Sequence, residues 1–123
     1  MPHLTHWIYR LLAAAWMAFI WFLSSQTSLP GIALFPGEDK IAHFSAFGLL
    51  AYLLARAQSP WHGRLATPTA VAIACAATGF GLVDEIHQSF VPGRIPSLAD
   101  LAADGAGAAV VIFMLWRPRS AGD

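Results

Sequence analysis

Four apolar runs joined by short polar connections set the limits on how this 123-residue sequence can fold. Hydrophobic residues make up 57% of the chain and charged residues only 11%, unlike the usage of soluble domains. Each run approaches the roughly 20 residues that a helix needs to cross a bilayer. We therefore predict an all-α membrane protein, one domain over residues 1–123, built as a bundle of four transmembrane helices. These helices are expected over residues 7–24, 40–57, 67–90 and 97–116.

Residues at the predicted helix ends indicate how the helices begin. Thr67 followed by Pro68 is typical of an N-cap with proline at the first helical position. Ser97 with Asp100 three residues later resembles a capping box, with Asp in place of Glu. Asp39 is placed to cap the second helix. Capping is therefore one interpretation of Asp39 and Asp100.

Small residues on the last two predicted helices favour close helix packing. Gly79 and Gly81 on one helix, with Gly105 and Gly107 on the other, allow backbones to approach closely. We expect these two helices to pack together, and similar faces would also permit a homo-oligomer. Cys75 is the single cysteine, so the sequence contains no disulfide framework and no cysteine metal motif. The apolar runs downstream favour an uncleaved first helix over a secretory signal.

The distribution of charge predicts an orientation in the membrane. The formal net charge is zero, so a basic footprint for nucleic acid is not present. If both termini are cytoplasmic, five of the seven basic residues lie inside, as the positive-inside rule prefers. These are Arg10, Arg56, Arg64, Arg117 and Arg119. The outer face then receives Lys40 and Arg94 together with Glu38, Asp39, Asp84, Glu85, Asp100 and Asp104.

Four of the ionisable residues at the outer end lie below the helix ends. At about 1.5 Å rise per residue, His43, Asp84, Glu85 and Asp104 sit roughly 6 to 10 Å inside. Asp84 shares a helix face with Gln88, four residues further on. Ionisable groups at this depth mark a functional site by default. We expect these residues to meet in one cleft.

Three occupants suit a cleft of this composition. Crowded carboxylates can hold or shuttle a proton. His43, His87 and carboxylates are permissible ligands of zinc or manganese, but the sequence has no H-x-x-x-H or H-E-x-x-H spacing, so a divalent metal is not favoured and no other cofactor is indicated. A lipid headgroup is the third occupant, with Lys40 and Arg94 offering contacts to phosphate.

The sequence contains three ordered motifs: Asp39–Phe44 (DKIAHF), Asp84–Arg94 (DEIHQSFVPGR) and Ser97–Asp100 (SLAD). Together they resemble the VanZ-like family of small bacterial membrane proteins. The resemblance covers the second to fourth predicted helices, about two thirds of the chain, and three motifs at matching spacing are more specific than any one alone. The family commonly has Asn one turn after the last motif, where this sequence has Asp104.

The resemblance implies a four-helix protein of the cytoplasmic membrane with its motifs grouped in one site. The namesake of the family is associated with resistance to the glycopeptide teicoplanin. By analogy, the implied site residues are Asp39, Lys40, His43, Asp84, Glu85, Gln88, Arg94 and Asp100, with Asp104 added from this sequence. Our leading hypothesis is an outward-facing polar cleft that engages an envelope lipid or a lipid-linked cell-wall component and so affects glycopeptide sensitivity.

Two further hypotheses remain open at this point. In the first, the protein is a membrane-embedded hydrolase or transferase acting on a lipid headgroup. Asp84 or Glu85 would then act as acid or base with His43 as partner, and Arg94 would clamp phosphate. In the second, the charged cluster only fixes helix register in a structural subunit. No recognised catalytic motif in the sequence decides between them.

Overall fold

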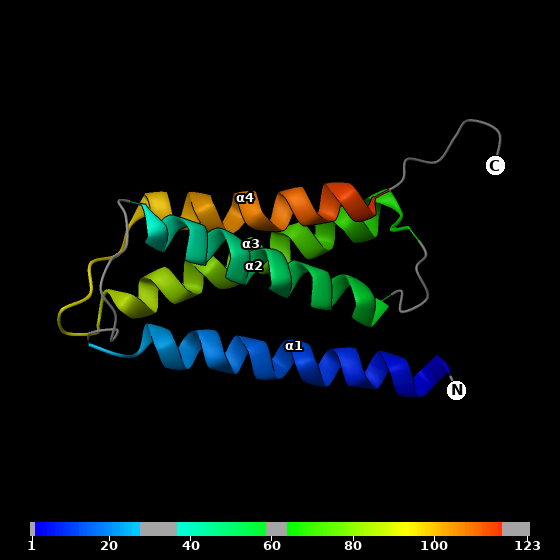
Figure 1. The fold of residues 1–123 in the computed structure, drawn as a ribbon, viewed down its shortest axis with the longest axis horizontal. Coiled ribbons are helices and arrows are strands. Elements are labelled where there is room, and N and C mark those ends of the chain that lie inside the picture. Colours follow the sequence, from blue (N-terminus) through cyan, green and yellow to red (C-terminus); the bar gives the residue numbers. More distant parts are fainter. Residues whose placement is uncertain (1, 28–36, 59–63, 117–123) are drawn as a thin grey trace.

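The computed structural model describes residues 2–27, 37–58 and 64–116, and within these the chain is helical. The four helices are α1 (Pro2–Ser24), α2 (Glu38–Gln58), α3 (Thr67–Gln88) and α4 (Leu98–Leu115). They lie side by side along one axis, so that α1 begins and α4 ends at the same end of the bundle (Figure 1). The all-α prediction is confirmed.

The predicted helix boundaries differ from those of the structure by up to five residues. The first helix begins at Pro2, five residues before the predicted start, since residues from there on continue the helix without a break. The third helix ends at Gln88 instead of residue 90, because the chain turns directly after it. Gly93 adopts a φ of +81° in the connection that follows, a backbone conformation that glycine reaches without strain.

The predicted helix caps had mixed outcomes. Ser97 is the N-cap of α4, and its hydroxyl oxygen accepts hydrogen bonds from the backbone N–H groups of Ala99 and Asp100. Thr67 is not an N-cap: α3 is preceded by Ala66, and the Thr67 hydroxyl instead accepts a hydrogen bond from the Trp116 indole at 2.9 Å. This bond ties the start of α3 to the end of α4.

The helix α2 is the centre of the bundle, because α1, α3 and α4 all pack against it. Its buried residues include Phe47, Leu50 and Ala51, which belong to the main apolar core. The most extensive contact is between α2 and α4, where Gly107 lies against the carbonyl oxygen of Phe44. The predicted packing of α3 on α4 is also present. The close contact of Gly107 with α2 was not predicted, because the small residues of α4 were assigned to packing against α3.

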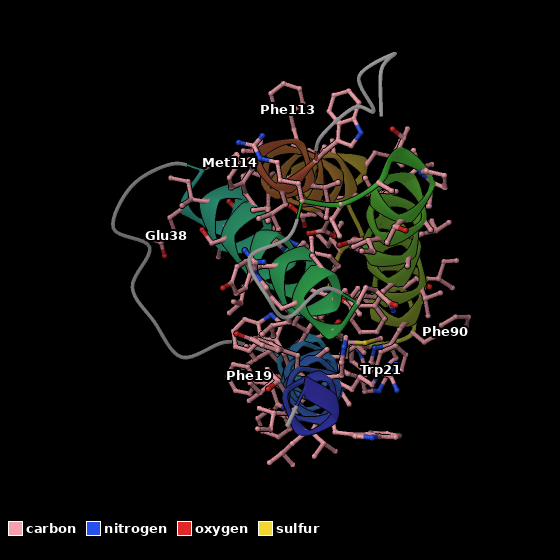
Figure 2. The ribbon with its side chains drawn as sticks, turned by 90° about the vertical axis from the view of Figure 1, so that its right-hand side faces the viewer. Phe19, Trp21, Glu38, Phe90, Phe113 and Met114 are labelled. Carbon is pink, nitrogen blue, oxygen red and sulfur yellow. The ribbon has the colours of Figure 1, made fainter. Side chains whose placement is uncertain are left out.

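Three of the helices are long and apolar enough to cross a membrane: Leu4–Ser24, Thr67–Gln88 and Leu98–Leu115. Their outward surfaces carry large apolar side chains such as Phe19, Phe113 and Met114, which point away from the bundle (Figure 2). The fourth helix, α2, has 21 residues but carries charged groups near both ends. Its polar content is compatible with its central place, since the neighbouring helices cover much of it.

Candidate functional site

The buried polar side chains of the described residues gather at one end of the bundle, where α1 and α3 end and α2 and α4 begin. They come from the ends of α1, α3 and α4 and comprise four carboxylates, one amide and one hydroxyl. The set is Ser24, Asp84, Glu85, Gln88, Asp100 and Asp104. Burial of this many polar groups in an apolar bundle is costly unless they are paired or bound.

His43 on α2 and Asp104 on α4 form the central contact of the site. The His43 Nδ1 atom lies 2.8 Å from Asp104 Oδ1, at hydrogen-bonding distance. Asp104 is fully buried, while His43 keeps 21% of its side chain exposed. Gly81 on α3 provides the space, since a methyl group at that position would lie 2.8 Å from Asp104 Oδ2. Three helices therefore define the position of one carboxylate.

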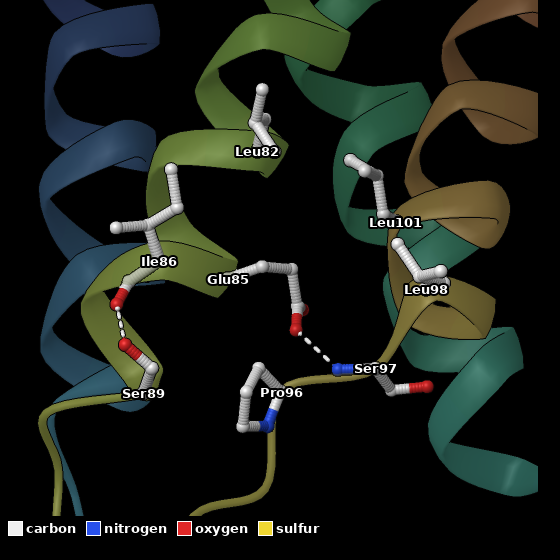
Figure 3. A pocket seen from close by; sticks show the side chains of 8 residues that line it. All are labelled: Leu82, Glu85, Ile86, Ser89, Pro96, Ser97, Leu98 and Leu101. Carbon is white, nitrogen blue, oxygen red and sulfur yellow. Dashed lines mark hydrogen bonds between the residues drawn. The ribbon is translucent and has the colours of Figure 1, made fainter.

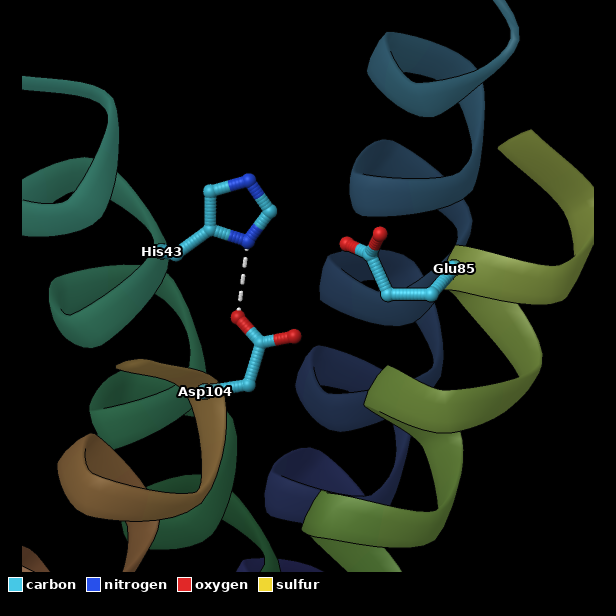
Figure 4. A group of neighbouring side chains, drawn as sticks. All are labelled: His43, Glu85 and Asp104. Atoms are coloured by element: carbon cyan, nitrogen blue, oxygen red, sulfur yellow. Dashed lines mark hydrogen bonds and ion pairs between the residues drawn. The ribbon is translucent and has the colours of Figure 1, made fainter. Parts of the chain in front are cut away.

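Glu85 on α3 completes a three-residue cluster with His43 and Asp104. One ligand atom from each of the three residues lies within 4.8 Å of the other two, and the Glu85 carboxylate points toward the other two side chains (Figure 4). Glu85 Oε2 accepts a hydrogen bond of 2.8 Å from the backbone N–H of Ser97. The second oxygens, Glu85 Oε1 and Asp104 Oδ2, are buried and have no hydrogen-bond partner within the described part of the chain. We refer to these three residues as the central cluster.

Lys40, at the start of α2, is linked to the central cluster through Asp100. Its ammonium group lies 2.5 Å from Asp100 and 2.6 Å from Asp39, and Asp100 Oδ2 is 3.8 Å from His43 Nε2. Asp39 lies in the first turn of α2, which begins at Glu38, so it pairs with Lys40 where we predicted a cap.

Asp84 lies beside the central cluster and faces a cavity of about 130 Å³ between α1, α2 and α3. Gln88 donates a long hydrogen bond of 3.4 Å to Asp84, which places both on one helix face as predicted. Arg94 also lines this cavity, together with Ser24 and His43. Arg94 Nη2 donates a hydrogen bond of 3.1 Å to the backbone carbonyl oxygen of Leu23, a contact that holds the guanidinium group against the end of α1.

A second cavity, of about 340 Å³, lies between the end of α3 and the start of α4 (Figure 3). Its walls are mainly apolar side chains, and Glu85 and two serines supply its polar groups. The lining residues are Leu82, Glu85, Ile86, Ser89, Pro96, Ser97, Leu98 and Leu101. Glu85 therefore belongs to this cavity, whereas His43 belongs to the smaller one.

Comparison with family models decides the family of this chain. A family model described as VanZ/LLP1 matches residues 6–118, which include every residue of both cavities and of the central cluster. The chain belongs to the VanZ/LLP1 family. The resemblance seen in the sequence is thereby confirmed. Comparisons with curated proteins and with solved structures gave no match.

Family membership and the apolar helices together identify a VanZ/LLP1 membrane protein. Within it, one buried polar residue near the site, Ser24, was not predicted to take part. Ser24 is buried and lines the smaller cavity, although its place directly after an apolar run was a signal that could have found it. His87, considered as a metal ligand, instead stacks on the Trp21 ring of α1 with ring centroids 3.8 Å apart.

Proposed function

We propose that this VanZ/LLP1 protein crosses the bacterial cytoplasmic membrane four times, with both termini in the cytoplasm and the site at the outer face. The charge pattern supports this orientation. Arg10, Arg56 and Arg64 belong to the end where α1 begins, α2 ends and α3 begins. The opposite end holds the site, with its acidic residues. Positive charge at the cytoplasmic ends of helices follows the usual rule.

The proposed ligand is an envelope lipid or a lipid-linked cell-wall component. The observation that carries this proposal is Arg94, a partly buried cation that lines a small cavity among apolar helices. Its Nε atom is buried and has no hydrogen-bond partner in the described structure. A guanidinium group binds phosphate through several N–H donors. Lys40, by contrast, already contacts two carboxylates.

The larger, mainly apolar cavity offers a place for hydrocarbon. Leu82, Ile86, Leu98 and Leu101 supply apolar walls to it, and all of these except Leu101 are also exposed on the outer surface of the bundle. A lipid with a phosphate headgroup has both an anionic group for Arg94 and hydrocarbon for the larger cavity. Binding a lipid-linked cell-wall component would change how much of that component is accessible to a glycopeptide such as teicoplanin. This effect would connect the site to the teicoplanin resistance associated with the family namesake.

The test compares wild type with two variants of Arg94. Wild type, Arg94→Lys and Arg94→Gln are reconstituted in phosphatidylcholine nanodiscs containing a small fraction of polyprenyl phosphate or phosphatidylglycerol, and retained lipid is measured by native mass spectrometry. Because a charge-assisted hydrogen bond contributes about 1.5 to 3 kcal/mol, Arg94→Gln should weaken retention about tenfold or more, and Arg94→Lys less.

Arg64→Gln is the matched control, since it removes an exposed arginine at the other end of the bundle. It should retain lipid as wild type does. Equal retention in all four proteins would overturn the proposed headgroup contact. In cells, the minimal inhibitory concentration of teicoplanin should differ between wild type and Arg94→Gln and should not differ between wild type and Arg64→Gln.

A second candidate function, lipid hydrolysis or transfer, is favoured by one observation. The hydrogen bond between His43 and Asp104 is the arrangement by which a carboxylate orients a histidine acting as general base. Glu85 or Asp84 would supply an acid at the same site. Cells that express wild type should then show lipid turnover that cells expressing Glu85→Gln lack. Identical lipid profiles at equal protein levels would exclude this function.

A further inference from the structure

Three helices each bring one metal-binding side chain to the same point inside the bundle. We propose that the central cluster, His43 of α2, Glu85 of α3 and Asp104 of α4, binds a divalent transition-metal ion of the zinc type. Ligand atoms from the three residues lie within 4.8 Å of one another, and the three side chains face one another (Figure 4). This site does not depend on whether the neighbouring cavities hold lipid.

A cation would stabilise the buried carboxylates of the central cluster. Glu85 and Asp104 are both buried, with exposed fractions of 5% and 0%. Each keeps one oxygen, Glu85 Oε1 and Asp104 Oδ2, buried without a hydrogen-bond partner among the described residues. Burial of an unpaired anion is strongly unfavourable. A cation between the two carboxylates would satisfy both oxygens at once.

The two basic side chains of this end of the bundle are already engaged elsewhere. Lys40 lies between Asp39 and Asp100, at 2.6 and 2.5 Å. Arg94 donates to the backbone carbonyl of Leu23 and lines the smaller cavity. Neither is seen to contact Glu85 or Asp104. The compensating charge must therefore come from a proton or from a bound ion.

The donor set selects the class of ion. One imidazole nitrogen with two carboxylates suits zinc and related transition metals, whereas magnesium and calcium prefer oxygen ligands alone. Three protein ligands leave a fourth position for water, as in catalytic zinc sites. Ligand bonds of about 2.1 Å require ligand atoms roughly 3.4 Å apart in a tetrahedral site. The most widely separated ligand atoms, within 4.8 Å of each other, must therefore approach by up to about 1.4 Å, which the long side chain of Glu85 can supply.

Neighbouring groups are placed to orient these ligands. The backbone N–H of Ser97 already holds Glu85 Oε2 at 2.8 Å, which leaves Oε1 for the ion. Asp100 Oδ2 is 3.8 Å from His43 Nε2, so it faces the ring nitrogen that would remain when Nδ1 binds metal. Carboxylates and backbone groups around the ligands commonly fix their orientation in this way. The ion would be reachable from both sides, because Glu85 lines the larger cavity and His43 the smaller one.

The experiment measures zinc binding by the full-length protein in phosphatidylcholine nanodiscs. The protein is purified with an affinity tag that lacks histidine, stripped with chelator, and titrated with Zn²⁺ against a fluorescent zinc indicator in excess Mg²⁺. Wild type should bind about one equivalent of zinc and melt at a higher temperature with zinc than without it. Asp104→Asn and Glu85→Gln keep the side-chain shapes, and each should weaken zinc binding by more than the 10- to 100-fold typical of an outer-shell change.

Two controls separate this site from adventitious binding. His87→Gln removes a histidine that stacks on Trp21 at the same end of the bundle, and His6→Gln removes a histidine at the opposite end, where its Nδ1 atom lies 2.8 Å from the carbonyl oxygen of Ala57. Both should bind zinc as wild type does. Melting temperatures without zinc verify that each variant is folded. If wild type binds no zinc, or if Asp104→Asn and Glu85→Gln bind it as well as wild type, the proposal is overturned.

Discussion

At the scale of single residues, the site depends on a glycine as much as on its charged groups. A side chain at Gly81 would meet Asp104 Oδ2 at 2.8 Å, Asp104 Cβ at 3.2 Å and the Phe47 ring at 3.2 Å. We predict that Gly81→Ala destabilises the protein by about 1 to 3 kcal/mol, because a packed interior resists an added methyl group. Unfolding in mixed detergent micelles, followed by circular dichroism during titration with sodium dodecyl sulfate, measures this change.

Gly79→Ala is the matched control on the same helix. A methyl group at Gly79 would contact nothing within 4 Å, so this variant should be neutral or slightly more stable, given the higher helix propensity of alanine. If Gly79→Ala and Gly81→Ala unfold alike, the steric account of Gly81 is wrong. The same pair also reports on the site, since only Gly81→Ala should displace the Asp104 carboxylate.

The sequence identified individual site residues better than it identified their partners. The depth of His43, Glu85 and Asp104 below the helix ends followed from counting residues along each helix, because helical rise is nearly constant. The contact between His43 and Asp104 could not be predicted, since it depends on how α2 and α4 rotate toward each other. The sequence did not favour a metal site, because the three proposed ligands lie on three different helices and leave no spacing pattern.

At the scale of helices, the contact between α2 and α4 determines the shape of the site. Gly107 lies so close to the Phe44 carbonyl that any side chain there would overlap it. We predict that Gly107→Ala forces the two helices apart and costs about 3 kcal/mol or more of stability, at the upper end of typical overpacking effects. Since α2 carries His43 and α4 carries Asp104, the same variant should weaken the contact between these side chains. Unfolding by sodium dodecyl sulfate measures the first effect.

Gly105→Ala tests whether the effect is specific to that contact. A methyl group at Gly105 would lie 3.5 Å or more from Thr78, an ordinary contact distance, so this variant should fold with nearly wild-type stability. Equal loss of stability in both variants would point to the general sensitivity of α4 and would contradict the close contact as the cause.

The helices themselves were predictable because long apolar runs and their polar connections are local features of the sequence. The errors occurred at helix ends, where tertiary contacts compete with local capping. Thr67 has the side chain of an N-cap but accepts a hydrogen bond from Trp116, directly after α4. Asp39 lies inside the first turn of α2 and pairs with its sequence neighbour Lys40. Ser97 caps α4 as predicted, but its backbone N–H donates to Glu85 of α3, so the predicted capping box with Asp100 is not formed.

At the scale of the whole molecule, polar groups are sorted to opposite ends of the bundle. Arginines without a role in the site belong to one end, and the buried carboxylates to the other. This separation constrains function, because a site open at the outer face can exchange with envelope lipids without a change of conformation. The same site open to the cytoplasm would meet lipid precursors on the side where they are made.

The orientation can be measured directly with two cysteine variants made in a Cys75→Ala background, which removes the single cysteine of the chain. Ser89 is exposed at the site end and Arg64 is exposed at the opposite end. We predict that a membrane-impermeant maleimide labels Ser89→Cys in intact cells and labels Arg64→Cys only after the membrane is broken, because the arginine-rich end should remain cytoplasmic. Labelling in the reverse order would place the central cluster and both cavities on the cytoplasmic side. An envelope-facing role would then fail, while the zinc and lipid-retention measurements in nanodiscs, which do not depend on orientation, would keep their meaning.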